Sequence, residues 1–179
     1  PWLVAWLTAP NLISTLTQAS GTSLFWSYFF GLLWGIGGLT FGLSMRFLGL
    51  SLGMAIALGF CASFGTLIPP IFTGQFMELI QHWSGLITLA GVLVCMIGIS
   101  FCGMAGMRKE KELSREEKQI AIKEFSLAKG LWVAFFSGIM SACMSFGISA
   151  GRPIAEMAIQ NGTPDLWQNT PVFIVILAG

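Results

Sequence analysis

The sequence predicts an all-α protein: a polytopic bundle of membrane-spanning helices that forms one transmembrane domain over residues 1–179. Hydrophobic residues make up 55% of the chain and charged residues only 9%, whereas soluble domains average about a quarter charged residues. Apolar runs of membrane-spanning length recur along the chain, since a hydrocarbon core of about 30 Å needs roughly 20 helical residues. Helices are the simplest way for such runs to satisfy their backbone groups in lipid.

We expect four complete spans and two partial ones. The complete spans cover residues 24–45, 50–72, 86–107 and 130–151, and the partial ones cover 1–8 and 171–179. Between them lie turn sequences rich in Gly, Pro, Asn and Asp, namely TAPN at 8–11, GQF at 74–76 and NGTPD at 161–165. Because the chain starts at Pro1 and ends in the apolar run PVFIVILAG, we expect a fragment cut within spans at both ends.

The basic residues predict the orientation. Seven of the nine Lys and Arg lie within 108–129, and Arg46 falls on the same side, while Arg152 stands alone on the other. The positive-inside rule therefore makes segment 108–129 cytoplasmic and directs the connections at 9–23, 74–85 and 152–168 outward. Five Glu accompany those bases, which favours a solvated helical linker over a lipid-binding or partner-binding patch.

Four tryptophans fall near predicted span ends, where amphipathic rings prefer the membrane interface: Trp26, Trp83, Trp132 and Trp167.

Glycines recur at four-residue spacing, which favours close helix packing in lipid. The alternative is that smooth glycine contacts let helices rock past each other. The pairs are Gly31 with Gly35, Gly38 with Gly42, and Gly49 with Gly53.

Two prolines, Pro69 and Pro70, lie near the outer end of the second complete span. Proline disfavours a helical conformation in the residue before it and removes an amide donor. We therefore expect Ile68 to leave the helix and free nearby carbonyls. Either the helix ends there at the interface, or the carbonyls face a cavity.

Serines recur every fourth residue in the last complete span, at Ser137, Ser141, Ser145 and Ser149. Four residues advance about 400° around a helix, so these side chains form one slowly drifting stripe. The stripe is either a packing seam whose hydroxyls bond to carbonyls four residues earlier, or the hydroxyl-lined wall of a solute pathway. Arg152 and Glu156 follow at the outer end, where a mutual ion pair or a place at the mouth of a cavity is expected.

The sequence argues against an enzyme. It has one histidine, His82, no HExxH pattern, no paired carboxylates within a span and no phosphate-binding loop. The four cysteines lack metal-ligand spacing and are interpreted as reduced packing residues. No cofactor or metal is therefore expected. Nucleic acid is not an expected partner either, since no basic face exists outside 108–129.

Several segments, taken in order, resemble the L-rhamnose/proton symporter family, a branch of the drug/metabolite transporter superfamily. They are FGLLWGIGGLTFGLSMRFLGLSLGMAIALG, FGTLIPPI, LAGVLVCMIGI, KEFSLAKGLWVA and SACMSFGISAGRPIAEMA. The resemblance implies ten helices in two inverted five-helix repeats, of which this chain covers the end of helix two to the start of helix seven. It also implies L-rhamnose import with a proton across the bacterial inner membrane.

The chain departs from the family pattern at one corner. Where the family has Lys-Pro followed by a His-Glu pair, this chain has Arg152 and Pro153 followed by Ala155 and Glu156. The cation and the carboxylate are kept in type, but the histidine is absent. The four complete spans contain no Asp or Glu, so either Glu156 couples the proton or the site lies in another part of the protein.

We therefore expect a secondary transporter whose partners are a small sugar, a proton and the lipid bilayer. A sugar needs hydroxyl partners and an aromatic face, and Trp34 lies near mid-span among glycines. The alternatives are transport of another solute of the same superfamily and a structural or sensory membrane subunit that transports nothing. The candidate pathway residues are Trp34, Thr40, Thr66, Ser141, Ser145, Ser149 and Arg152, with Glu156 as the candidate for proton coupling.

Overall fold

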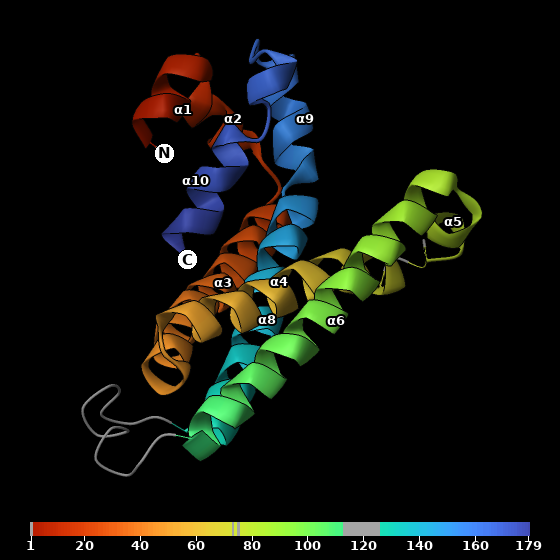
Figure 1. The fold of residues 1–179 in the computed structure, drawn as a ribbon. Coiled ribbons are helices and arrows are strands. Elements are labelled where there is room, and N and C mark those ends of the chain that lie inside the picture. Colours follow the sequence, from red (N-terminus) through yellow and green to blue (C-terminus); the bar gives the residue numbers. More distant parts are fainter. Residues whose placement is uncertain (1, 73, 75, 113–125) are drawn as a thin grey trace. The chain divides into compact units, whose positions relative to one another are not determined.

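The computed structural model describes residues 2–72, 74, 76–112 and 126–179, and this part of the chain is helical without strands. Figure 1 shows the helices. Their bounds are α1 Trp2–Thr8, α2 Leu12–Gln18, α3 Gly21–Leu48, α4 Leu50–Phe72, α5 Phe76–Gln81, α6 Trp83–Glu112, α8 Leu127–Ala150, α9 Arg152–Gln160, the 3-10 turn η1 Asp165–Trp167, and α10 Thr170–Ala178.

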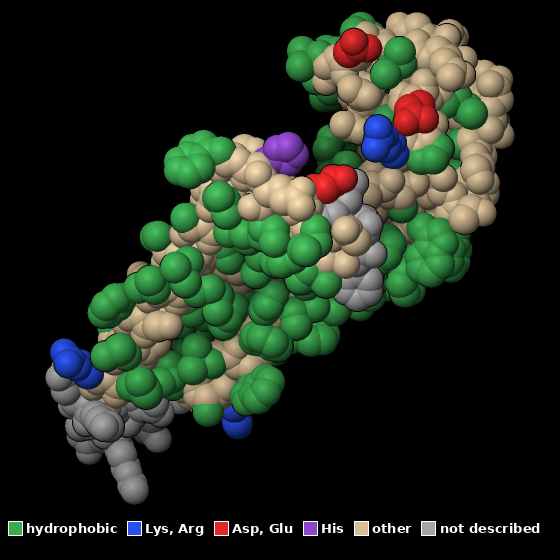
Figure 2. Space-filling view, turned by 90° about the vertical axis from the view of Figure 1, so that its right-hand side faces the viewer, with side chains coloured by type: hydrophobic (Ala, Val, Ile, Leu, Met, Phe, Trp, Pro, Cys, Tyr) green, Lys and Arg blue, Asp and Glu red, His purple; other side chains and the backbone are tan. Residues whose placement is uncertain are grey.

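Four segments of the described chain are long and apolar enough to cross a membrane: Gly21–Leu48, Leu50–Ile71, Trp83–Arg108 and Leu127–Gln160. They correspond one to one with the predicted complete spans, so the all-helical, polytopic class is confirmed. In Figure 2 hydrophobic side chains cover much of the long-helix surface, and charged side chains lie at its margins. Such an apolar exterior is the surface that a lipid environment favours.

The connections predicted at 9–23, 74–85 and 152–168 are more ordered than expected, because they contain α2, α5 and α9. In α9, Ile154, Ala155 and Ala158 are buried while Arg152 and Glu156 are exposed. This short amphipathic pattern explains why the segment is helical.

The predicted cytoplasmic segment 108–129 is helical up to Glu112 and again from Leu127. The linker conformation expected between these positions lies outside the described residues.

The prediction that Ile68 leaves the helix is wrong. Helix α4 continues through Ile68, Pro69 and Pro70 and ends at Phe72. A proline removes the hydrogen bond to the carbonyl four residues earlier, so only acceptors in the last turns are affected. The nearby end of α4 agrees with the interpretation of the prolines as a helix end.

The chain falls into two compact units, and helices α3 and α8 contribute residues to both. Unit 1 comprises Pro1–Gly35 and Cys143–Gly179, and unit 2 comprises Ile36–Ala142. In unit 1, α10 contacts α1, α2 and α9. Its core has two apolar clusters, Ala5, Ala9, Leu12 and Ile174, and Ile154, Ala155, Val172 and Ile176.

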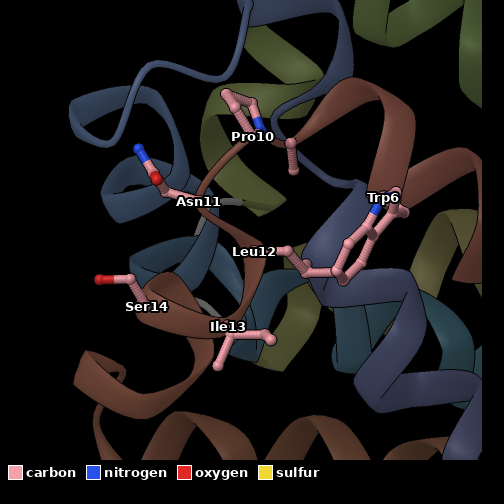
Figure 3. A pocket seen from close by; sticks show the side chains of 7 residues that line it. Trp6, Pro10, Asn11, Leu12, Ile13 and Ser14 are labelled. Carbon is pink, nitrogen blue, oxygen red and sulfur yellow. The ribbon is translucent and has the colours of Figure 1, made fainter.

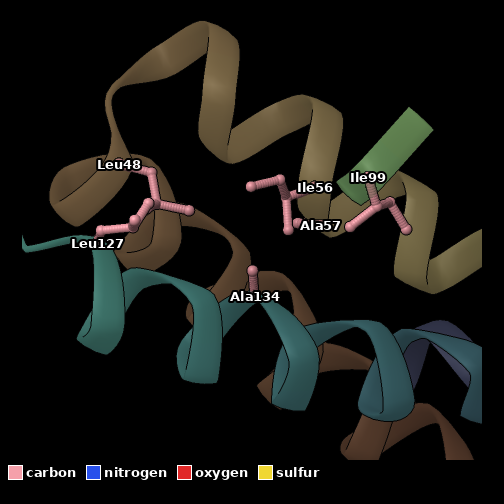
Figure 4. Close-up of a cluster of buried hydrophobic side chains, with 6 residues drawn as sticks. All are labelled: Leu48, Ile56, Ala57, Ile99, Leu127 and Ala134. Atoms are coloured by element: carbon pink, nitrogen blue, oxygen red, sulfur yellow. The ribbon is translucent and has the colours of Figure 1, made fainter. Parts of the chain in front are cut away.

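In unit 2, α4 lies along α6, and α5 packs on α6 as well. Figure 4 shows the buried cluster that joins α4, α6 and α8 to the end of α3. Its members are Leu48, Ile56, Ala57, Ile99, Leu127 and Ala134. The chain turns between α3 and α4 at Gly49, whose φ of 82° is a conformation that favours glycine.

The glycine prediction holds for some positions only. Gly31 lies directly on the backbone of Ile176, and a Cβ at Gly53 would lie 2.8 Å from the Met45 Cα. Around Gly35, Gly38 and Gly42, by contrast, the described residues leave open space. The four-residue spacing therefore marks close packing at one member of two pairs.

Candidate functional site

Two buried serines link α3 and α8 through glycine carbonyls. In unit 1, Ser27 Oγ donates to the Gly147 carbonyl at 3.1 Å. In unit 2, Ser137 Oγ donates to the Gly37 carbonyl at 2.9 Å. Both serines are at most 1% exposed, and a buried hydroxyl without a partner is costly. A glycine has no side chain to shield its carbonyl, so each pairing allows the two helices to approach closely.

The candidate pathway residues of unit 2 are Ser141, Thr40 and Thr66. Ser141 is half-buried, hydrogen bonds with the Cys61 thiol and lies against Gly37, where a Cβ would come within 2.9 Å of the serine Oγ. The Thr40 hydroxyl donates to the Ile36 and Gly37 carbonyls, and the Thr66 hydroxyl donates to Ala62 at 2.8 Å. Both threonines thus satisfy their hydroxyl protons within their own helices.

The candidate pathway residues on α3 and α8 of unit 1 are Trp34, Ser145 and Ser149. Trp34 and Ser145 are half-buried and Ser149 is exposed. Ser149 Oγ donates to the Ser145 carbonyl at 2.9 Å, which is the back-bonding that the packing-seam interpretation predicted. One turn away, the rings of Phe30 and Phe146 stack with centroids 5.5 Å apart. A pathway role for these three residues stays a prediction.

Arg152 and Glu156 form an ion pair on the first turns of α9. The Arg152 Nε and Glu156 Oε1 atoms are 3.3 Å apart, and the two side chains are 81% and 60% exposed. The structure thus contains the pair that the sequence suggested. Exposed pairs of this spacing stabilise a helix by only about 0.3 to 0.5 kcal/mol. The pair can therefore open at little cost.

A small polar cluster in unit 1 was missed by the sequence analysis. Asn11 Nδ2 donates to the Asn161 carbonyl, Asn161 Nδ2 donates to Thr15 Oγ1, and Thr15 Oγ1 donates to the Asn11 carbonyl, at 2.9, 2.9 and 3.0 Å. These bonds connect the start of α2 to the end of α9. The turn sequences TAPN and NGTPD marked both positions but could not indicate that they meet.

Beside this cluster, the joint between α1 and α2 forms an open cavity of about 280 Å³. In Figure 3 the Trp6 ring lies beside Leu12, while the polar ends of Asn11 and Ser14 point to the opposite side. Because the polar groups and the ring do not converge, this cavity does not offer the combined hydroxyl and aromatic contacts that a sugar needs.

No set of three or more His, Cys, Asp or Glu side chains within the described ranges is arranged to hold a metal ion. The cysteines Cys61, Cys95, Cys102 and Cys143 are free thiols.

Long apolar helices joined at close small-residue contacts, with hydroxyls and one exposed ion pair, define a polytopic helical membrane protein. Within that class, the chain belongs to the L-rhamnose-proton symport protein (RhaT) family, whose model matches residues 1–179. The resemblance found from the sequence is thereby confirmed, and the family name describes a transporter rather than an enzyme.

Three similar relatives are named L-rhamnose-proton symporter, from Escherichia coli O1:K1 / APEC and from the E. coli strains ATCC 8739 and SMS-3-5. Each is 40% identical to this chain over 179 residues, which is 100% of the chain and 51% of the relative. The chain thus spans about half the length of the curated relatives it matches. No solved structure matches it significantly.

Proposed function

We propose that the protein takes part in the import of L-rhamnose together with a proton across the bacterial inner membrane. The observation that supports this most strongly is the family match over residues 1–179, together with 40% identity to symporters of that name. The four helices of spanning length agree with a membrane transporter. In this proposal the basic segment 108–129 faces the cytoplasm, and α9 faces outward.

The proposed sugar path uses hydroxyls and one aromatic ring. Ser141, Ser145, Ser149, Thr40 and Thr66 offer hydroxyl oxygens. Those of Ser149, Thr40 and Thr66 can accept further hydrogen bonds while their protons are held within the protein. The half-buried ring of Trp34 would pack against the C–H face of the sugar. Hydroxyl groups and an aromatic ring are the two kinds of contact that carbohydrate sites combine.

Proton coupling is assigned to Glu156 in this proposal. Its carboxylate pairs with Arg152 while ionised. Protonation of Glu156 would abolish the attraction and release the Arg152 guanidinium, which would then be free to donate to a sugar hydroxyl, so that binding of the proton favours binding of the sugar. Because the pair is exposed and weak, such an exchange needs little energy.

The experiment is uptake of labelled L-rhamnose by proteoliposomes that contain the full-length protein. With the outside made acidic, we expect sugar to accumulate inside and a protonophore to abolish the accumulation. Uptake that does not depend on the proton gradient would contradict symport. Competition with other deoxysugars and with unrelated metabolites then tests the substrate, and equal competition by these would contradict L-rhamnose.

The variant Glu156→Gln tests the coupling step. We expect it to lose gradient-driven accumulation while it still exchanges labelled for unlabelled sugar, because exchange needs no net proton movement. Asp165→Asn is the matched control, since Asp165 is also an exposed acid of unit 1 but lies outside α9. Normal accumulation by Glu156→Gln would place proton coupling elsewhere in the protein.

A further inference from the structure

Unit 2 contains an apolar groove that differs chemically from the α1–α2 cavity of unit 1 and that the proposed transport does not use. The groove has a volume of about 280 Å³ and is lined by Phe60 of α4 and by Leu131, Trp132 and Phe135 of α8. The Phe135 ring meets Phe60 edge-on at 5.5 Å and Trp132 edge-on at 6.0 Å, measured between centroids. Aromatic side chains thus form fixed walls around an opening without polar lining.

The groove lies near one end of α8. This helix begins at Leu127, and at 1.5 Å per residue Trp132 lies about 8 Å and Phe135 about 12 Å along it. The Trp132 side chain is 73% exposed, as expected for an interfacial tryptophan. These depths match the region where acyl chains begin, just below the lipid headgroups.

Lys129 places a positive charge about one helical turn before Trp132, toward the start of α8. Lys129 is exposed and comes three residues before Trp132, so the two side chains lie on the same face of α8. Arg46 and Arg108 belong to the same end of unit 2, because Ser126 N donates to the Phe47 carbonyl and Gly106 packs against Leu127. A long lysine side chain near a helix end extends its ammonium group to the headgroup level.

We propose that this groove, formed by Phe60, Leu131, Trp132 and Phe135, binds one acyl chain of an anionic phospholipid whose phosphate contacts Lys129. A sugar is a poor occupant because the lining offers no hydrogen-bond partner. A transmembrane helix is a poor occupant too, since close helix contacts use small residues rather than large rings. A flexible chain below an anionic headgroup fits both the apolar walls and the charge.

The test is native mass spectrometry of the full-length protein, delipidated in detergent and titrated with phosphatidylglycerol or phosphatidylcholine of identical acyl chains. We expect phosphatidylglycerol to be retained in preference to phosphatidylcholine. Lys129→Gln should weaken phosphatidylglycerol binding about fivefold, the effect of one cation near an anionic surface, and leave phosphatidylcholine unchanged. Arg108→Gln is the matched control: Arg108 belongs to the same end of unit 2 but lies on α6, which contributes no lining residue, so its effect should be clearly smaller than that of Lys129→Gln. Equal retention of the two lipids, or an unaltered Lys129→Gln variant, would overturn the proposal.

The acyl chain is tested separately. Trp132→Ala should weaken binding of both lipids, whereas Trp83→Ala should not, although Trp83 is an equally exposed tryptophan on α6. Equal effects of the two substitutions would contradict binding of the acyl chain in the groove.

A photoreactive phosphatidylglycerol should label the wild-type protein within residues 127–136, independently of any variant. Labelling confined to other helices, or protection of 127–136 by another part of the protein, would also count against it. These readouts need no transport, so they remain decisive if the proposed function fails.

Discussion

At the scale of single residues, helix contacts in this protein depend on glycines, which have no side chain, as much as on the side chains that touch. Gly31 and Gly35 are one helical turn apart, yet only Gly31 lies against a neighbouring backbone, that of Ile176. Gly37 and Gly147 accept hydroxyl hydrogen bonds from Ser137 and Ser27. In lipid, close approach and such bonds replace the hydrophobic driving force of soluble proteins.

Gly31→Ala should therefore destabilise the protein, because the added methyl would overlap the Ile176 backbone and force α3 and α10 apart. Overpacking of this kind costs about 1 to 3 kcal/mol. Gly35→Ala is the matched control, since the described residues leave open space there. Thermal unfolding in detergent measures the difference. An equal loss of stability in the two variants would contradict the packing described for α3.

At the scale of elements, the short helices in the connections fix how the chain leaves and re-enters the long helices. The N-cap of α2, Asn11, and the C-cap of α9, Asn161, share hydrogen bonds with the buried Thr15. This arrangement joins two connections that are 150 residues apart in the sequence. Secondary structure alone would leave both ends frayed, so the bonds give each short helix its stable end.

Asn161→Ala should loosen this joint, because it removes the amide that donates to Thr15. The expected loss is about 1 kcal/mol, a typical net value for one hydrogen bond. Hydrogen exchange should become faster in α2 and at the end of α9. Asn169→Ala serves as the comparison, since the Asn169 side chain makes no cap hydrogen bond to α10. Unchanged protection of α2 in the Asn161 variant would argue against the joint.

At the scale of the whole molecule, charge and aromatic placement follow the requirements of a bilayer. The tryptophans expected at interfaces, Trp26, Trp83, Trp132 and Trp167, are all exposed. Most of the basic residues lie in one connection between two spans. These features support the proposed orientation, in which segment 108–129 is cytoplasmic.

The orientation can be measured by cysteine labelling. In a full-length variant in which every cysteine is replaced by alanine, including Cys61, Cys95, Cys102 and Cys143, Gln160→Cys should react with an impermeant maleimide in intact spheroplasts. Arg108→Cys should react only after the membrane is opened, because basic connections are retained inside. The opposite pattern would reverse the proposed topology.

The residue pattern was enough to predict the helical class, the four long apolar helices of the described residues and the family. Uncharged runs of about 20 residues have few structural solutions in lipid, and the motifs around FGLLWGIGG and GRPIAEMA resembled one family. The pairing of Arg152 with Glu156 could also be suggested, because a spacing of four residues places them on one helix face.

Which helix faces meet could not be predicted from the residue pattern and is seen only in the folded chain. A lipid-type helix is hydrophobic all round, so its pattern does not indicate the side turned toward a neighbour. Gly31 and Gly35, or Ser137 and Ser149, look equivalent in the sequence. One member of each pair is packed against another helix, and the other faces open space or bonds within its own helix. That difference depends on where distant segments such as α10 approach, which local residue patterns do not contain.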